Sequence, residues 1–382
     1  MNPWIVTLFW FCVALLGYTY VGYPLLVWAA GYCRRVRLDR EPWTKPISVV
    51  LVAHNEGARI ARKLDGIFAS DCQTQICEVL VGSDGSTDDT ALVVQAYPDD
   101  RVRLVAFPER RGKAACLNEL IPECQAELVV LTDVRQELDR TAIRELCANF
   151  ADVRVGVASG ELILRPVDEI SAASRGIVAY WNYEKFIRKC ESRFRSVPGA
   201  TGAFYAVRKN IFRPIPQATV LDDVAIPLRI IARGYHCAFD PAAVAYDEPS
   251  RTHRQEAIRK RRTIAGCLQL LKQAPEWLDP RENPIWWEFV SHKVLRLMSP
   301  WLLGLLAVTN ALLTPYDPYF YLMALQGVFY LLAALGWHYQ RNGQVSRIGG
   351  ALLIFVTLNL TTVTAWWDAV RGRFSPTWQR AA

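Results

Sequence analysis

A long stretch without charge near the start of the chain constrains the fold more than any other feature. Residues Asn2 to Cys33 contain no charged side chain, and about 20 apolar residues suffice for a helix to cross a bilayer. A cleaved signal peptide would have a shorter apolar core with basic residues before it. The stretch is followed by Arg34, Arg35, Arg37 and Arg40, and such residues mark the cytoplasmic side of a span. We therefore expect residues 1–33 to hold a transmembrane helix whose N-terminus lies outside.

The last third of the chain is apolar again. Three further candidate spans lie at residues 297–313, 319–339 and 348–366. We therefore expect C-terminal transmembrane helices within 297–370 and a multi-pass protein of the plasma (inner) membrane. Three crossings that begin inside would end outside, whereas the arginines of the tail favour the inside. One of the three candidates could instead be re-entrant or lie flat, and the sequence leaves this open.

The segment before these candidates is amphipathic. Residues 282–297 mix tryptophan, phenylalanine, valine and leucine with charged residues and a histidine. This pattern is typical of a helix that lies in the membrane interface. A buried helix of the globular part is the alternative.

The composition indicates which kinds of molecule the protein can bind. The chain is 52% hydrophobic and 21% charged, with a formal net charge of +7. It is too apolar to be disordered, and its charge fits an anionic membrane surface or an anionic substrate. The sequence contains no basic recognition helix and no aromatic-basic motif, so we expect no nucleic-acid partner. The 10 cysteines form no CxxC pair, which argues against a zinc ribbon and for reduced thiols.

The pattern changes between the two apolar ends. From Lys45 onward, short runs rich in Val, Leu and Ile alternate with helix-like segments. We expect strands at 47–53, 78–82, 102–107 and 128–133. This alternation indicates an α/β domain with a mostly parallel central sheet, at residues 45–270 and in the cytoplasm. Ligands of such sheets bind at the carboxyl ends of the strands.

Polar residues follow the predicted strands at this edge. Asn55 and Glu56 follow the first strand, which ends at Ala53, and Asp84 follows the second. Lys113 comes after the third strand, and the fourth ends at Asp133, with Arg135 behind it. Carboxylates can hold ribose hydroxyls, uracil or a metal ion, and cations can hold a diphosphate. Taken singly, residues 86–89 could be a helix N-cap and residues 110–113 a solvated turn. The sequence has no GxGxxG after a strand, and Lys113 is not followed by the Ser or Thr of a P-loop.

Later segments complete the candidate site. The small residues Gly199, Ala200, Thr201 and Gly202 would let a ligand approach the backbone closely, and a tight turn is the alternative. Asp222 and Asp223 lie in an apolar setting that would raise the pKa of a general base, or they form a helix N-cap. A basic run at 259–262 could contact lipid headgroups.

The order of these motifs resembles the membrane-bound family 2 glycosyltransferases with a GT-A fold. This group includes cellulose, hyaluronan, chitin-oligosaccharide and poly-N-acetylglucosamine synthases, and the resemblance covers nearly the whole chain. Asp84 matches the family's nucleotide-binding Asp, and Asp133 matches the first Asp of its DxD motif. The pair Asp222-Asp223 matches the acidic pair whose last Asp is the family's catalytic base. Residues 259–263 lie where the family has QxxRW.

The resemblance implies an inverting transfer from a nucleotide-sugar donor, expected to be a UDP-sugar. The acceptor would be a glycan or a lipid-linked molecule at the cytoplasmic membrane face, in polysaccharide biosynthesis. Asp223 would act as the general base beside Asp222. Donor contacts would come from Ala53, Asn55, Glu56, Asp84, Lys113, Asp133, Arg135, Arg259 and Arg262. Acceptor contacts would come from Gly199, Ala200, Thr201 and Gly202. Asp133 would hold Mg²⁺ or Mn²⁺.

The chain departs from the family pattern at two places. Arg135 replaces the second acid of the DxD motif, so we expect the metal ion to be retained but held weakly. Arg259 and Thr263 replace the Gln and Trp of QxxRW, and that Trp accompanies processive synthesis in the family. Two alternatives therefore stay open: a non-processive polyprenyl-phosphate glycosyltransferase, and a catalytically dead glycan- or nucleotide-binding membrane protein. A transporter fits least.

Overall fold

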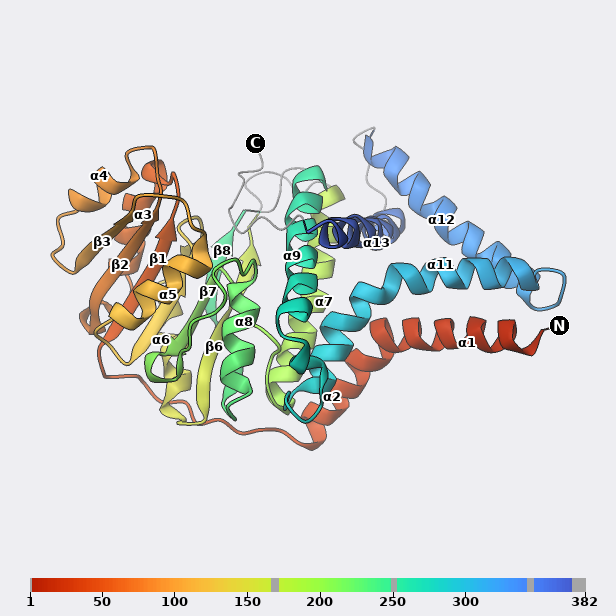
Figure 1. Ribbon diagram of the computed structural model, residues 1–382, viewed down its shortest axis with the longest axis horizontal. Helices are drawn as coiled ribbons and strands as arrows, with labels where there is room; N and C mark the ends of the chain where they lie inside the picture. The colour runs from red at the N-terminus through yellow and green to blue at the C-terminus, as the bar shows by residue number, and fades with distance from the viewer. Residues whose placement is uncertain (1, 166–171, 249–252, 342–346, 373–382) are drawn as a thin grey trace.

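The computed structural model describes residues 2–165, 172–248, 253–341 and 347–372. An α/β domain lies at one end of the molecule, and long helices project from it at the other end (Figure 1). The strands are β1 (Ile47–Ala53), β2 (Ile76–Asp84), β3 (Val102–Phe107), β4 (Leu128–Thr132), β5 (Glu137–Leu138), β6 (Val155–Leu164), β7 (Phe204–Arg208) and β8 (His236–Asp247).

The helices belong to both parts. Those before and within the α/β domain are α1 (Pro3–Gly17), α2 (Tyr23–Cys33), α3 (Gly57–Phe68), α4 (Thr90–Gln95), α5 (Lys113–Glu123), α6 (Ala142–Ala148), α7 (Ala172–Phe194), α8 (Asp222–Ile231) and α9 (His253–Gln273). They are followed by α10 (Trp286–Phe289), α11 (Leu295–Leu313), α12 (Tyr319–Arg341) and α13 (Arg347–Val370). Two π-helical turns, Tyr18–Gly22 and Val290–Val294, join α1 to α2 and α10 to α11.

One eight-stranded sheet forms the centre of the α/β domain, in the order β3-β2-β1-β4-β7-β6-β8-β5. The four strands from β3 to β4 run parallel, and β7 is antiparallel to both of its neighbours. The expectation of a mostly parallel sheet is thus confirmed. The strands predicted at 47–53 and 102–107 coincide with β1 and β3. β2 extends further than predicted at both ends, and β4 ends at Thr132 rather than Asp133.

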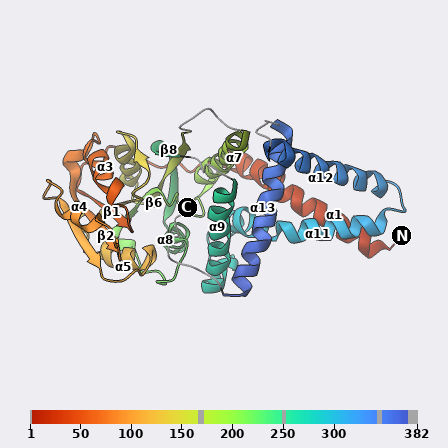
Figure 2. The same cartoon turned by 90° about the horizontal axis from the view of Figure 1, so that it is seen from above.

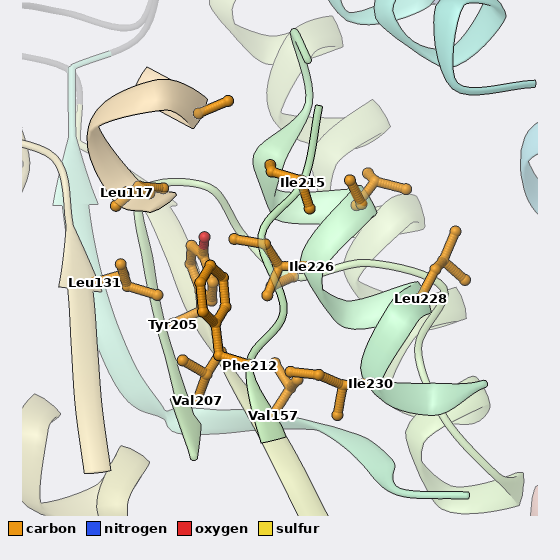
Figure 3. Close-up of a cluster of buried hydrophobic side chains, with 14 of the residues drawn as sticks. Leu117, Leu131, Val157, Tyr205, Val207, Phe212, Ile215, Ile226, Leu228 and Ile230 are labelled. Carbon is orange, nitrogen blue, oxygen red and sulfur yellow. The ribbon is translucent and has the colours of Figure 1, made fainter. Parts of the chain in front are cut away.

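Helices cover both faces of the sheet because the central strands are apolar on both faces. In β1, Val49 and Leu51 face a core that includes α3 and α6, whereas Val50 and Val52 face a core that includes α5 and α8. Figure 3 shows the second core, with Tyr205 of β7 among aliphatic side chains. All 10 cysteines are unpaired, and most are buried. The polar loops are left at the carboxyl edge of the sheet.

Four helical segments are long and apolar enough to cross a membrane: Pro3–Cys33, Trp286–Leu313, Tyr319–Tyr339 and Leu352–Val370. α1 and α11 lie side by side, and Phe9, Leu313 and Tyr319 form a cluster at the end away from the sheet (Figure 1). From Trp286 onward, the segment predicted to lie in the interface, 282–297, is the first part of the second of these helices. Its place in a membrane stays a prediction, as do the domain limits.

Arg208 at the end of β7 allows a test of the polar contacts inside the domain. Its guanidinium donates to the carbonyl oxygens of Phe150 at 2.6 Å and Val155 at 2.9 Å, and it pairs with Glu127 at 2.7 Å. Arg208→Met would keep an apolar stem but leave these buried acceptors unpaired. We expect a loss of about 2–4 kcal/mol in the free energy of unfolding, measured by denaturant or thermal unfolding in detergent.

The matched control is Arg62→Met, because Arg62 pairs with Glu137 at the surface and the two side chains are 82% and 56% exposed. Exposed ion pairs contribute less than about 1 kcal/mol. Equal destabilisation by the two substitutions would contradict the role given to Arg208.

Candidate active site

The loops after β1 and β2 are joined by hydrogen bonds. Asn55 has a positive φ of 55°, and its side-chain oxygen accepts from the Thr87 amide at 2.8 Å. The Glu56 amide donates to Thr90 Oγ1 at 2.8 Å. Asp88 accepts from the Thr90 amide at 3.0 Å, so part of this acidic segment closes a turn at the start of α4. Asn55 and Glu56 therefore hold two strand ends together.

Asp84 ends β2 and anchors the loop that leads into α5. Its carboxylate oxygens accept from the backbone amides of Arg111 at 2.6 Å and Gly112 at 2.9 Å. Gly112 has a φ of 91°, a conformation that favours glycine. Because both oxygens of Asp84 bind this loop, the residue fixes the place from which Lys113 extends. Ala53, at the end of the adjacent β1, is fully buried.

Lys113 forms the centre of an acidic cluster. Its ammonium donates to Asp133 Oδ1 at 2.7 Å and to the Gly202 carbonyl oxygen at 3.2 Å, and it lies 3.5 Å from Asp222 Oδ2. Burial would lower the pKa of Lys113, but the carboxylates of Asp133 and Asp222 outweigh burial and hold the pKa above its usual range. Lys113 is therefore a charged link between α5, the end of β4, the small-residue segment 199–202 and α8.

Asp222 and Asp223 are the first residues of α8, and neither side chain caps the helix. Asp222 Oδ2 accepts from the Tyr205 hydroxyl at 3.0 Å. The backbone carbonyl of Asp223 accepts from the Ala200 amide at 2.6 Å. A methyl group added at Gly202 would lie 2.8 Å from Asp223 Oδ2. The small-residue segment thus lies against the Asp223 carboxylate, and a larger residue at Gly202 would displace that carboxylate.

The pKa of Asp223 is shifted towards neutrality. Burial and the neighbouring Asp222 carboxylate raise it to about 6, against the opposing charges of Lys113, Lys293 and Arg188. A carboxyl group with this pKa is ionised at neutral pH, yet it is basic enough to take a proton from a hydroxyl in a transition state. Asp223 therefore has the properties of a general base.

The sequence did not reveal two residues that shape this cluster, the partly buried Arg188 and the buried Tyr205. Arg188 of α7 donates to Thr201 Oγ1 at 2.9 Å and to the Gly199 carbonyl oxygen at 3.1 Å. It therefore ties the small-residue segment to α7. Tyr205 is fully buried and orients Asp222. The sequence around these two residues does not indicate their role. Arg188 is one of several cations on a long helix, and Tyr205 simply follows the small-residue segment.

Arg135 is directed to a second acid. It forms an ion pair with Asp247 at the end of β8. Gln136 Nε2 donates to Asp247 Oδ2 at 2.9 Å, and Arg259 Nη2 lies 3.7 Å from the same oxygen. The sequence did not single out Asp247, whose side chain is buried. Its negative charge offsets that of Arg135, so repulsion of a cation at Asp133 is weaker than an unpaired guanidinium would cause.

The basic side chains at 259–262 of α9 interact with different parts of the protein. Desolvation lowers the pKa of Arg262, and the carboxylates of the acidic cluster act in the opposite direction, which places its guanidinium within their electrostatic range. Lys260 lies over aromatic rings of α7, and Arg261 pairs with Asp368 of α13. Only part of the run is therefore directed towards the candidate site.

The residues at this edge fit a weakly held divalent ion. The described residues contain no group of three His, Cys, Asp or Glu side chains that could hold a metal. Lys113 contacts Oδ1 of Asp133, and the Asp133 side chain is 30% exposed. Mg²⁺ usually takes one or two carboxylates and completes its shell with water and substrate phosphates. Asp133 therefore suits an ion that arrives with a diphosphate.

Comparison with known proteins identifies the domain. Residues 48–215 match the family model described as glycosyl transferase family 2. The chain is 24% identical over 205 residues to the poly-beta-1,6-N-acetyl-D-glucosamine synthase of Staphylococcus aureus, an alignment that covers 52% of this chain and 49% of the synthase. It is 21% identical over 271 residues to a probable glycosyltransferase of Bacillus subtilis, covering 64% and 62% of the two chains. The chain thus spans about half the length of the synthase that it matches.

A solved structure has the same fold over nearly the full length. The mannosyltransferase PcManGT from Pyrobaculum calidifontis, solved in complex with GDP-Man and Mn²⁺, aligns with a TM-score of 0.72 at 24% identity. The alignment covers 96% of this chain and 99% of that one. The expected GT-A fold is confirmed.

Proposed function

We propose that this chain, a glycosyltransferase with a family 2 domain and a GT-A fold, transfers a sugar from a nucleotide-sugar donor, expected to be a UDP-sugar. The acceptor is a glycan or a lipid-linked molecule at the cytoplasmic face of the membrane, and the transfer inverts the anomeric centre. The similarity to a poly-beta-1,6-N-acetyl-D-glucosamine synthase supports a place in polysaccharide biosynthesis. The four candidate spans support a membrane-bound enzyme.

The position of Asp223 is the observation that carries this proposal. Its carboxylate has a pKa of about 6 and lies directly beside Gly202. An acceptor bound along residues 199–202 would therefore place its hydroxyl next to this base. The cations Lys113 and Arg262 lie within electrostatic range of the same acidic cluster, where a leaving diphosphate needs positive charge.

The mechanism follows from this arrangement. The acceptor oxygen attacks the anomeric carbon from the face opposite the diphosphate, and the bond between that carbon and the diphosphate oxygen breaks. Asp223 takes the hydroxyl proton. Lys113 and Arg262 stabilise the charge that develops on the diphosphate. A divalent ion held by Asp133 and the diphosphate would supply further positive charge when bound.

We assign the nucleoside to the loops after β1 and β2. Ala53 and Asp84 end these two strands, and Asn55 and Glu56 follow the first of them. The hydrogen bonds of Asn55 and Glu56 to the segment after β2 give a rigid surface for a base and a ribose. Arg135 and Arg259 belong to the same donor side. A donor phosphate that reached them would compete with Asp247 for their charge.

Transfer of a single sugar to a polyprenyl phosphate is the second candidate, and the residue at position 263 favours it. Thr263 occupies the place of the Trp in QxxRW, and its hydroxyl donates to the Arg259 carbonyl oxygen of its own helix at 3.1 Å. This position therefore offers no aromatic surface to a growing glycan. Product length separates the two candidates.

The proposal is tested by incubating the purified full chain in lipid with a panel of nucleotide sugars and measuring released nucleoside diphosphate. We expect turnover with at least one donor, and a loss of on the order of 10²-fold or more in Asp223→Asn, the usual scale for a general base. Donor binding should persist in this variant. Turnover close to that of the unaltered protein would move the base elsewhere, with Asp222 next in line.

The pH dependence of turnover reports the pKa of Asp223. The base must be ionised, so kcat should rise with pH through about 6 and level off above it. Lys293 lowers the pKa of Asp223, so Lys293→Gln should move this limb upward by roughly half a pH unit or more. The control is Lys189→Gln, because Lys189 pairs with Glu161. A downward movement in Lys293→Gln, or an equal movement in both variants, would contradict the assignment.

Metal removal tests the weak site at Asp133. One protein carboxylate and the diphosphate should hold the ion loosely, so excess chelator should abolish turnover and millimolar Mg²⁺ or Mn²⁺ should restore it. Arg135→Asp should lower the metal concentration needed for half-maximal activity. Full activity in excess chelator that is lost in Arg135→Ala would show that the arginine does the work of the ion.

A further inference from the structure

We propose that α13 does not cross the bilayer but lies in the membrane interface on the side of the catalytic domain, with one apolar face against lipid. The chain then crosses the membrane three times. This inference takes Pro3–Gly22, α11 and α12 as the spans, so that the candidates Pro3–Cys33 and Trp286–Leu313 extend beyond the bilayer on the side of the catalytic domain. It does not depend on the sugar-transfer chemistry. α1 and α11 project from the α/β domain in a common direction, and α13 runs across them (Figure 2).

The contacts of α13 place it beside the junction of α1 with α2 and beside the start of α11, and its Phe355 also packs on Phe329 of α12. Phe355 packs on Tyr20, with ring centroids 5.1 Å apart. Tyr20 belongs to the turn that joins α1 to α2, and Tyr18 of the same turn lies 2.7 Å from Ser291 Oγ, just before α11. The first half of α13 therefore lies at the level where α11 begins.

The end of α13 lies at the same level. Trp366 Nε1 donates to the carbonyl oxygen of Leu297, at the start of α11, at 2.9 Å. Asp368 accepts from Arg261 Nη2 of α9 at 2.7 Å. A spanning helix would bring its end to the opposite side, near the cluster of Leu313 and Tyr319. Contacts with α9 and Leu297 exclude that placement.

A helix on a water-exposed surface turns its polar side chains outward and its apolar side chains inward, and the exposed and buried faces of α13 show the opposite pattern. Its exposed apolar side chains are Leu360, Val363, Trp367 and Val370. Their spacing puts them on one helical stripe. The side chains turned into the protein include Asn359, Thr361, Thr362 and Ala365. An apolar stripe with a tryptophan, continuous with three spans, fits acyl chains just below the headgroups.

This placement removes the conflict over the basic residues. With three crossings, the catalytic domain and the end of the chain are on one side, together with Arg341, Arg347 and Arg371. The loop 314–318 on the other side contains no lysine or arginine. All these residues then follow the positive-inside rule.

The ion pair of Arg261 with Asp368 also links the membrane helix to the site. Arg262, the next residue of α9, lies within electrostatic range of the acidic cluster. Lipid that holds α13 in the interface therefore also fixes the α9 segment from which Arg262 extends.

Depth measurements test the proposal on the full chain in nanodiscs. Spin labels are placed singly at Leu360→Cys and Val370→Cys in a chain that also carries Cys33→Ser, because Cys33 is an exposed free thiol. Relaxation by oxygen and by a water-soluble nickel chelate gives the depth of each label. Both positions are exposed, so folding should be unaffected. Ten residues of a spanning helix cover about 15 Å. We expect two shallow positions whose depths differ by less than about 5 Å, in keeping with a helix that lies along the interface.

The control pair is Leu325→Cys and Leu335→Cys in α12, which has the same spacing and should show a depth difference close to about 15 Å. An equally large difference in α13 would overturn the proposal, as would labels that only water reaches. Dipolar broadening between labels of two molecules would assign the face to a second copy and would also overturn it. A tag joined after Ala382 should be protected in sealed cells, and its accessibility from outside would exclude three crossings.

Discussion

The ammonium of Lys113 is the charge on which the candidate site depends. Asp133, Asp222 and Asp223 would otherwise gather three carboxylates at one edge of the sheet. At an effective dielectric of about 20, two unit charges ~4 Å apart interact by roughly 4 kcal/mol. Lys113 offsets this repulsion by direct contact with Asp133 and by its proximity to Asp222. Its position follows from Asp84, which holds the preceding loop by two backbone amides.

This arrangement gives two adjacent carboxylates different properties. Asp222 is fixed between the Tyr205 hydroxyl and Lys113, which stabilise its charge. The side chain of Asp223 has no such direct partner among the described hydrogen bonds, and burial together with the charge of Asp222 raises its pKa to about 6. These differences support the proposal that Asp223 is the base and Asp222 the positioning acid. Because Gly202 carries no side chain, the Asp223 carboxylate can lie against the small-residue segment, where we propose that the acceptor binds.

Sequence patterns located the part of the site that depends on local structure. β1 and β3 were placed with their observed limits, because continuous apolar runs identify buried parallel strands. The polar residues at strand ends followed from the same topology. The pair of Arg135 with Asp247 could not be derived, since it depends on β8 lying beside β6 and β5. Arg188 was missed for a similar reason: its pattern is that of a surface cation, and only tertiary packing buries it.

Hydropathy also has a limit that α13 illustrates. A window average measures how many apolar residues a helix contains, but it does not show where they point. α13 passes such a test, yet its polar residues face the protein and its exposed stripe is apolar. In the interfacial placement that we propose, Asp368 near its end costs little, because Arg261 of α9 neutralises it outside the bilayer core. The same ion pair would be costly for a helix that carried Asp368 across the membrane, away from the domain that holds its partner.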